Sequence, residues 1–579
     1  MPFSIAARRL GLIIGVVLAG SLLPAAFAAE QGAIAGYADY KELARQVEAL
    51  AKPGLCEVGS LGTTLGGRKI FVVTIGTGKT ADKPAILVVG NVHAPQLLGS
   101  ELAVRIARRL IGRSATDAAA KELLERYTFY IIPRPSPDAS EAFFQKPLRE
   151  REGNLHVIRD ERDPDADRDP AEDLNHDGLI TMMRVADDAG HWRMAPDDSR
   201  AMITADPQKG EHGQYERYVE GRHDDSAPRR SAGADGVAFN RNFPFRYPHY
   251  KPLAGPNAVS EIETRAVADF AFDHPNIAVV FCFSPEDNLL HPWKPQREKG
   301  PIFSALMPED AAEFEYVAEK FRTIVGGTDA PPSPPGEGSF SEWAYFHYGR
   351  WSFASRGWWV PKVGEAKPQA AADAKEQGKP KANADQPDGG KYSAGDEGID
   401  PVNALRWLDR ENIDGFVPWT RIEHPDFPGR KVEVGGFKPF VLINPPARLL
   451  DPIAEKQTDF VLELARLMPQ VKIADARAEP LGGGIQRITA TVSNPGYLPT
   501  SSEMGQTTGE IYPLILKLVV PKGTQFLKGA ARGEIERIRG GGKTQSVWLI
   551  RLPDGKPGSA TVSVSSPSVG SDTKTLELK

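Results

Sequence analysis

The sequence predicts an α/β domain with helices on both faces of a sheet, followed by a C-terminal β-sandwich. Before about Lys472, apolar runs of strand length alternate with amphipathic helical segments, which is typical of a sheet covered on both faces. From there on, short strand-like segments follow one another between Gly, Pro and Asn turns, which indicates a sandwich over residues 472–579.

The clearest strand is the apolar run 85–90, which follows Pro84 and is typical of a strand buried on both faces. A helix follows at once, with an apolar stripe at Leu98, Leu102, Ile106 and Leu110. Glu101 lies away from that stripe, on the side of Arg105, so we expect it to be a solvated surface charge.

Other segments complete the α/β pattern. We expect strands at 71–75, 127–132 and 277–283, and helices at 39–50 and 265–272. The spacing Ser260-x-x-Glu263 matches a capping box and predicts where the last of these helices opens. Residues 364–398 are polar and rich in Ala, Lys, Gly and Pro, which predicts a disordered insertion.

Composition excludes several classes of protein. The chain has 579 residues, 41% of them hydrophobic, so a wholly disordered protein is excluded. Its net charge of -6 argues against a polybasic nucleic-acid binder, and we expect no nucleic-acid partner. With only Cys56 and Cys282, neither a disulfide framework nor a thiolate-rich zinc module can form, and one bridge is the maximum.

The N-terminus has the pattern of a signal peptide over residues 1–28. Two arginines precede an apolar run at 10–23, and Ala26-Phe27-Ala28 offers a cleavage site after Ala28. An N-terminal membrane anchor is the alternative, but the run is shorter than the ~20 residues that a spanning helix needs. We therefore expect an exported protein, periplasmic, extracellular or at the cell surface, with no membrane span after cleavage.

Two short motifs carry candidate chemistry. His93 and Gln96 stand where the strand 85–90 turns into a helix, and a His-x-x-Glu at such a turn can direct both side chains at one zinc ion. Here the fourth residue is Gln96. Further on, Asn240 and Arg241 offer amide and guanidinium donors, which suit the capture of a carboxylate.

Together with other motifs, these pieces resemble the carboxypeptidase A-like family of zinc metallopeptidases. The matching stretches occur in the family's order between about Asp39 and Lys472, at 61–70, 135–138, 240–243 and 342–345. The resemblance implies a mixed central sheet flanked by helices over residues 29–471. It also implies catalytic zinc and the release of C-terminal residues from peptides.

The resemblance places the family's functional residues one by one. Its zinc ligands fall on His93, Gln96 and Phe283, and its catalytic glutamate falls on Arg356. One imidazole and one neutral amide do not hold zinc tightly, and an arginine cannot serve as general base. We therefore expect a non-hydrolytic homologue that has not retained zinc.

The substrate-carboxylate pair of the family matches Asn240 and Arg241, which are both kept. The prediction is that they bind a peptide C-terminus, with Arg356 in the same pocket. The alternative for Arg356 is an internal pair with an acid such as Glu342.

Two other readings stay open at this point. One is an active zinc metallocarboxypeptidase whose ligands fall elsewhere, with His291 as a possible surrogate ligand. The other is a surface interaction protein that acts through its β-sandwich, with the first domain as a scaffold.

Residues 173–180 match the first eight positions of a calcium-binding loop. Asp173, Asn175 and Asp177 supply oxygen at alternate positions, and Gly178 permits the sharp turn. Position twelve is Arg184 instead of the usual glutamate. Further carboxylates precede the loop, at Asp165, Asp167 and Asp169, so the alternatives are a calcium site and a solvated acidic loop.

Overall fold

A computed structural model describes residues 35–156, 171–223, 236–297, 303–327, 329–363, 398–553 and 557–579. The predicted signal peptide, the carboxylates of Asp165, Asp167 and Asp169, and residues 364–397 of the predicted insertion lie outside these ranges. Within them, every helix is too short or too polar to span a bilayer.

The body of the protein is built on a mixed six-stranded sheet, as predicted. Its strands follow the order β1 (Cys56–Thr63), β2 (Lys69–Ile75), β4 (Thr128–Ile132), β3 (Ala85–Val89), β9 (Ile277–Phe283) and β10 (Trp351–Ser355). The pairs β1–β2 and β2–β4 are antiparallel, whereas β4, β3, β9 and β10 run parallel. The carboxyl ends of three neighbouring parallel strands, β3, β9 and β10, therefore meet at one edge.

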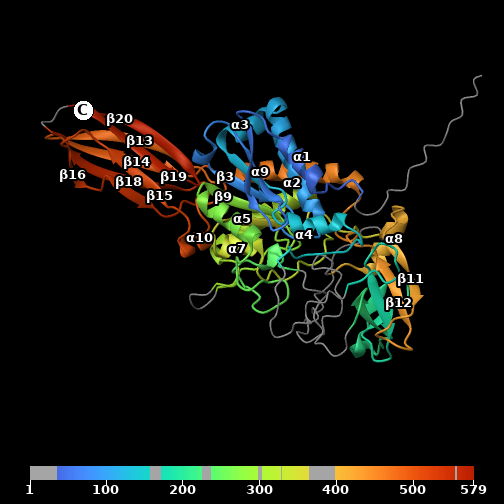
Figure 1. The fold of residues 1–579 in the computed structure, drawn as a ribbon. Helices are drawn as coiled ribbons and strands as arrows, with labels where there is room; N and C mark the ends of the chain where they lie inside the picture. The colour runs from blue at the N-terminus through green and yellow to red at the C-terminus, as the bar shows by residue number, and fades with distance from the viewer. Residues whose placement is uncertain are drawn as a thin grey trace, which may run out of the picture.

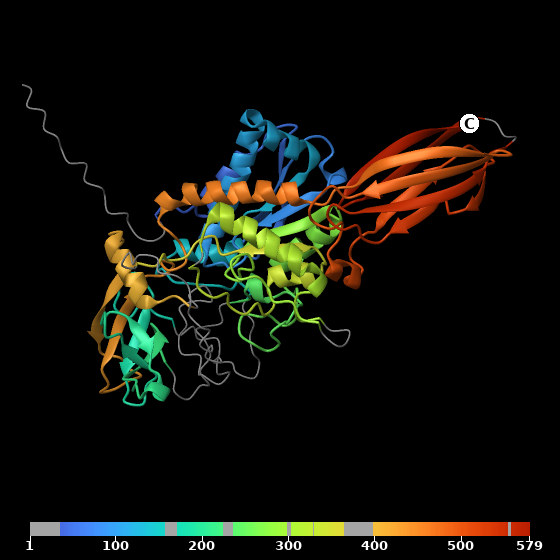
Figure 2. The same ribbon diagram turned by 180° about the vertical axis from the view of Figure 1, so that it is seen from behind.

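Helices cover both faces of this sheet. One face carries α1 (Tyr40–Glu48), α2 (Leu97–Thr116), α3 (Ala118–Arg126), α6 (Ala311–Val325) and α9 (Leu450–Leu467). In Figure 2, α9 (orange) and α6 (yellow-green) lie side by side along it. The other face carries α5 (Ile262–Asp273) and α7 (Phe340–Phe346). Each face has its own apolar core, and alternate residues of β3 pack into the two cores. Val88 lies in the core beneath α2 and α9, and Val89 lies in the core beneath α5 and α7.

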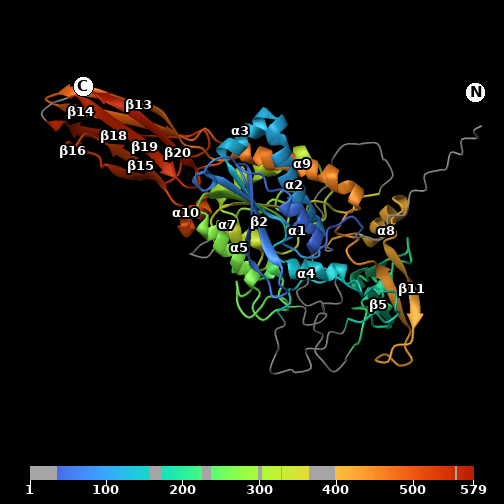
Figure 3. The same cartoon turned by 45° about the horizontal axis from the view of Figure 1, so that its top comes forward.

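A second, antiparallel sheet joins segments that are far apart in the sequence. Its order is β11 (Phe416–Ile422), β12 (Val432–Phe437), β5 (Met182–Ala186), β8 (Tyr215–Val219), β6 (Trp192–Met194) and β7 (Met202–Thr204). In Figures 1 and 3 it lies beside α8 (Pro401–Arg410), at the end of the molecule away from the C-terminal strands. The sequence did not predict this sheet.

The C-terminal strands form two four-stranded antiparallel sheets around one apolar core, as predicted. One sheet contains β13 (Lys472–Gly482), β14 (Ile485–Ser493), β18 (Lys543–Arg551) and β16 (Gln525–Lys528). The other contains β17 (Arg532–Ile535), β15 (Leu514–Val519), β19 (Gly558–Ser566) and β20 (Gly570–Leu578). The core between them includes Trp548 and Val562. Figure 1 shows this sandwich in red, extending from the α/β body.

Glu101 and the two cysteines differ from what the sequence suggested or allowed. Glu101 is buried, not solvated, because the N-terminal segment packs over it: its carboxylate accepts a hydrogen bond from the Ala38 amide (2.8 Å) and pairs with Arg105. Cys56 and Cys282 are both free and buried, so the one possible bridge does not form.

Asp310 joins the α/β body to the helical segment between strands β14 and β15 of the sandwich. Its fully buried carboxylate accepts hydrogen bonds from the Tyr345 hydroxyl (2.8 Å) and from the amide of Glu503 (2.9 Å), just before α10 (Glu503–Thr508) completes its first turn. The Arg537 guanidinium donates to it at 3.0 Å. Burial raises the pKa of Asp310 to about 6.

We expect Asp310→Asn to lower the free energy of unfolding at pH 7.5 by about 1 to 3 kcal/mol, because one of the two buried oxygens that accept from Tyr345, the Glu503 amide and Arg537 becomes an NH2 group that cannot accept. Chemical denaturation followed by fluorescence measures the change. Glu309→Gln is the matched control, since that neighbour pairs with Arg297 at the surface and should cost less than about 1 kcal/mol. Equal losses in the two variants would contradict the role of Asp310.

Candidate functional site

The site starts at the turn after β3, which Asn91 holds in shape. Asn91 has a left-handed backbone (φ 46°), and its amide donates to the carbonyl oxygens of His93 and Gln96, both at 2.9 Å. Its side-chain oxygen accepts a hydrogen bond from Ser140 at 2.6 Å. These bonds are all buried, and they hold the backbone of the turn that carries His93 and Gln96.

The structure brings His93, Gln96 and Arg356 together at the carboxyl edge of the sheet. The Gln96 amide donates to the backbone carbonyl of Arg356 at 2.6 Å. His93 is 4% exposed, and its Nε2 has no hydrogen-bond partner among the described residues. The cavity that these three residues line with Trp358 has a volume of about 10 Å³. That is room for one water molecule or one ion.

Phe283 and Arg356 occupy the other two positions that the resemblance singles out. Phe283 ends β9 and is 1% exposed, with its ring 5.1 Å from that of Phe281 inside the apolar core. The buried Arg356 guanidinium donates to the carbonyl oxygens of Pro332 (2.9 Å) and Pro285 (3.2 Å). It does not pair with Glu342, the alternative considered from sequence, because Glu342 instead faces Arg246 at 3.7 Å.

The residues at this metal position, His93, Gln96 and Phe283, do not fit a catalytic zinc ion. They offer one imidazole and one amide oxygen where zinc requires three good ligands. His291 does not replace the missing ligand, because its Nε2 lies 2.9 Å from the Pro331 carbonyl oxygen. Throughout the described ranges, no three His, Cys, Asp or Glu side chains are grouped so that they could hold a metal.

A larger cleft of about 200 Å³ opens beside the metal position and shares His93 with it. Asn240 and Arg241 line this cleft, but Arg356 does not, so the two arginines do not share one pocket as we had expected. Two acids already contact the pair. The Asn240 amide donates to Glu286 at 2.7 Å, and the Arg241 guanidinium lies 3.9 Å from Glu337.

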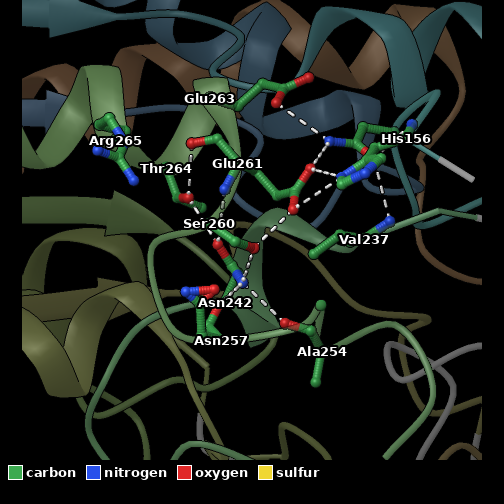
Figure 4. Close-up of polar contacts among 12 residues, drawn as sticks. His156, Val237, Asn242, Ala254, Asn257, Ser260, Glu261, Glu263, Thr264 and Arg265 are labelled. Carbon is green, nitrogen blue, oxygen red and sulfur yellow. Dashed lines mark hydrogen bonds and ion pairs between the residues drawn. The ribbon is translucent and has the colours of Figure 1, made fainter. Parts of the chain in front are cut away.

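A buried polar network holds Val237 and Asn242, on either side of Asn240 and Arg241 in the sequence (Figure 4). Asn242 donates to the Ala254 carbonyl at 2.7 Å and accepts from the Thr264 hydroxyl at 2.7 Å. Asn154 accepts from the Val237 amide at 3.1 Å. Its own amide donates to two buried carboxylates, those of Glu261 (2.9 Å) and Glu263 (3.1 Å).

The same network overturns the predicted capping box. Helix α5 begins at Ile262, one residue after Glu261, and no side chain caps it. The Ser260 hydroxyl donates to Glu261 at 2.6 Å, and Glu263 turns to Asn154. The side chains of Ser260 and Glu263 thus bond to Glu261 and Asn154 instead of to the backbone at the helix start. The spacing of the two residues in the sequence does not predict these partners.

The predicted calcium loop is closed by its own side chains. Asp173 accepts from the amide of Gly178 at 2.8 Å, and Asn175 accepts from the amide of Asp177 at 3.0 Å. Glu220, which directly follows β8, is fully buried and accepts hydrogen bonds from the amides of Leu174 and Thr181. These bonds fix the loop to the end of β8. Arg184 is buried and pairs with Glu433 at 2.9 Å, so it offers no ligand at position twelve.

Fold and site together define an α/β protein with a cleft at the carboxyl edge of a mixed sheet, next to His93. A model of the zinc carboxypeptidase family matches residues 42–356, so the chain belongs to that family. Residues 470–577 match a second family, described as a domain of unknown function.

Individual relatives match over short stretches. Carboxypeptidase B of Astacus astacus is 31% identical over 104 residues, which are 18% of this chain and 33% of the relative. Carboxypeptidase A6 of Mus musculus is 33% identical over 82 residues, 14% of this chain and 19% of the relative. The chain thus spans a third or less of the length of these relatives.

Matches to solved structures have low identity and low TM-scores. The crystal structure of thrombin activatable fibrinolysis inhibitor has a TM-score of 0.38 and 12% identity, and the match covers 74% of this chain and 73% of that one. A metallo-carboxypeptidase from Burkholderia cenocepacia has a TM-score of 0.30 and 16% identity, over 54% and 58% of the two chains.

The pKa of Glu342 reflects the charges that surround it. Burial raises its pKa to about 7, Arg246 lowers it, and the negative charges of Glu286 and Glu337 raise it again. An acid whose pKa is higher in the folded state than in the unfolded state binds its proton more tightly when folded. Stability therefore falls as the pH rises from about 4.5 to about 7.

We expect Glu342→Gln to remove that part of the pH dependence, because glutamine stays neutral. Between pH 4.5 and 7.5 the variant should gain roughly 2 to 4 kcal/mol of unfolding free energy relative to the wild type. Urea denaturation at a series of pH values measures it, with Glu315→Gln on the surface of α6 as the control. Parallel pH curves for wild type and Glu342→Gln would refute the assignment.

Proposed function

We propose that this protein is an exported, non-hydrolytic member of the zinc carboxypeptidase family that binds peptides. The observation that carries the proposal is the set of side chains at the metal position. Gln96 uses its amide nitrogen on the Arg356 carbonyl, Phe283 is part of the apolar core, and Arg356 stands where a general base is required.

Each departure removes a different part of hydrolysis. Without three ligands, no metal ion would polarise the peptide carbonyl or acidify a water molecule. Without a carboxylate at position 356, no group would take the proton from that water. The cleft lined by Asn240 and Arg241 nevertheless persists at the carboxyl edge of the sheet, which supports a binding role.

We expect purified protein to contain well under one zinc per chain and to release no C-terminal residues from peptides. Elemental analysis after dialysis, with peptide hydrolysis followed by mass spectrometry, measures both. An active zinc carboxypeptidase run in parallel is the control. Stoichiometric zinc, together with turnover that a chelator abolishes, would establish the alternative of an active peptidase.

We also propose that residues 173–180 bind calcium. The oxygens of Asp173, Asn175 and Asp177 belong to one tight loop, with His176 (φ 59°) and Gly178 (φ 85°) both in the left-handed region. Three oxygen side chains at alternate positions suit a calcium ion, which prefers hard oxygen ligands.

Millimolar calcium should raise the melting temperature of the wild type, because a ligand that binds only the folded state stabilises it by mass action. Asp177→Ala should lose most of that increase. Asp188→Ala, at an exposed acid outside the loop, should keep it and serves as the control. An unchanged melting temperature for the wild type would reject the site.

A further inference from the structure

The cleft beside the metal position has an acidic lining. We call it the acidic cleft and define it by the charged residues on its wall: Glu152, Glu286, Glu337 and Arg241. Three acidic residues and one arginine thus line the cleft. The volume of about 200 Å³ is below the ~300 to 1,000 Å³ of sites for drug-sized ligands, so the cleft suits a single side chain.

The two groups that suit a carboxylate ligand already have carboxylate partners. Glu286 accepts from the amide of Asn240 at 2.7 Å and from the hydroxyl of Ser284. Glu337 lies between Arg241 (3.9 Å) and Lys251 (2.8 Å). An incoming carboxylate would have to displace these acids and would be repelled by them, whereas a cation would be attracted.

His93 supplies a second, independent indication of a ligand. It is 4% exposed, lies on the wall of the acidic cleft, and its Nε2 has no hydrogen-bond partner among the described residues. A buried polar atom without a partner costs free energy unless a ligand or water satisfies it. An unprotonated imidazole nitrogen accepts an N–H, and lysine and arginine side chains are rich in such donors and offer no acceptor.

We propose that the acidic cleft binds the cationic side chain of a lysine or arginine within a peptide, between the Glu286 carboxylate and His93. Binding would depend on the side-chain charge and not on a free C-terminus. The inference rests on the proposed non-hydrolytic function and names the ligand class of the same cleft. The raised pKa of Glu342, caused in part by Glu286 and Glu337, agrees with an accumulation of negative charge there.

The test uses the full-length protein and three fluorescent pentapeptides with blocked N-termini. The first two are also blocked at the C-terminus, and they carry one central lysine or, at that place, Nε-acetyl-lysine. The third is an alanine peptide whose free C-terminal carboxylate is its only charge. Fluorescence anisotropy measures the dissociation constants. We expect the lysine peptide to bind and the other two to bind at least about tenfold more weakly, the effect of one charge-assisted hydrogen bond.

Variants locate the binding. Glu286→Gln keeps the shape and can still accept from Asn240, and it should weaken the lysine peptide about tenfold or more. Glu315→Gln makes the same change of charge on the surface of α6 and should have no effect. If Glu286→Gln does not fold, as judged by its melting curve, Glu337→Gln at the partly exposed rim gives the same readout.

The outcomes separate this inference from the proposed function. Equal binding of the lysine and acetyl-lysine peptides, preference for the free carboxylate, no binding, or no effect of the glutamate variants would each overturn the cationic ligand. None of these results requires hydrolysis. Stoichiometric zinc with turnover would overturn the proposed function itself, whichever peptide binds.

Discussion

The site depends on one constraint: three parallel strands end at the same edge, and the buried backbone groups of the turns that follow must find hydrogen-bond partners. Buried side chains supply them. Asn288 accepts from the amide of Ala354 at 2.8 Å and donates to the Ser352 carbonyl at 3.0 Å, which joins the chain after β9 to β10. Asp287 accepts from the amides of Leu290 (2.7 Å) and Arg356 (2.9 Å). These bonds, with those of Asn91, shape the edge.

That arrangement separates the framework of the edge from the side chains that line the cavity. A residue at the edge contributes a backbone group to the framework and a side chain to the cavity, and the two are independent. Arg356 shows this directly, since Asp287 holds its amide while its guanidinium turns to the carbonyls of Pro285 and Pro332. Substitution at such a position alters the function of the cleft while the framework bond is kept.

Much of the fold could be predicted because the central strands are long apolar runs, as β3 and β9 illustrate. The second sheet could not, since its strands are short and pair across the chain, as Val432 does with Val185. At the site, motif spacing pointed to His93, Gln96, Phe283 and Arg356. Glu286 and Glu337 could not be predicted as site residues, because no sequence motif includes them. Only the folded chain brings them to Asn240 and Arg241 respectively.

A catalytic zinc ion with an open coordination position does not hold a chain together as a structural zinc does. Stability here comes from the two apolar cores on either face of the sheet and from satisfied buried polar groups. The Gln96 bond to the Arg356 carbonyl even ties the turn after β3 to the end of β10. This framework carries a cleft with Glu286 and Glu337 on its wall.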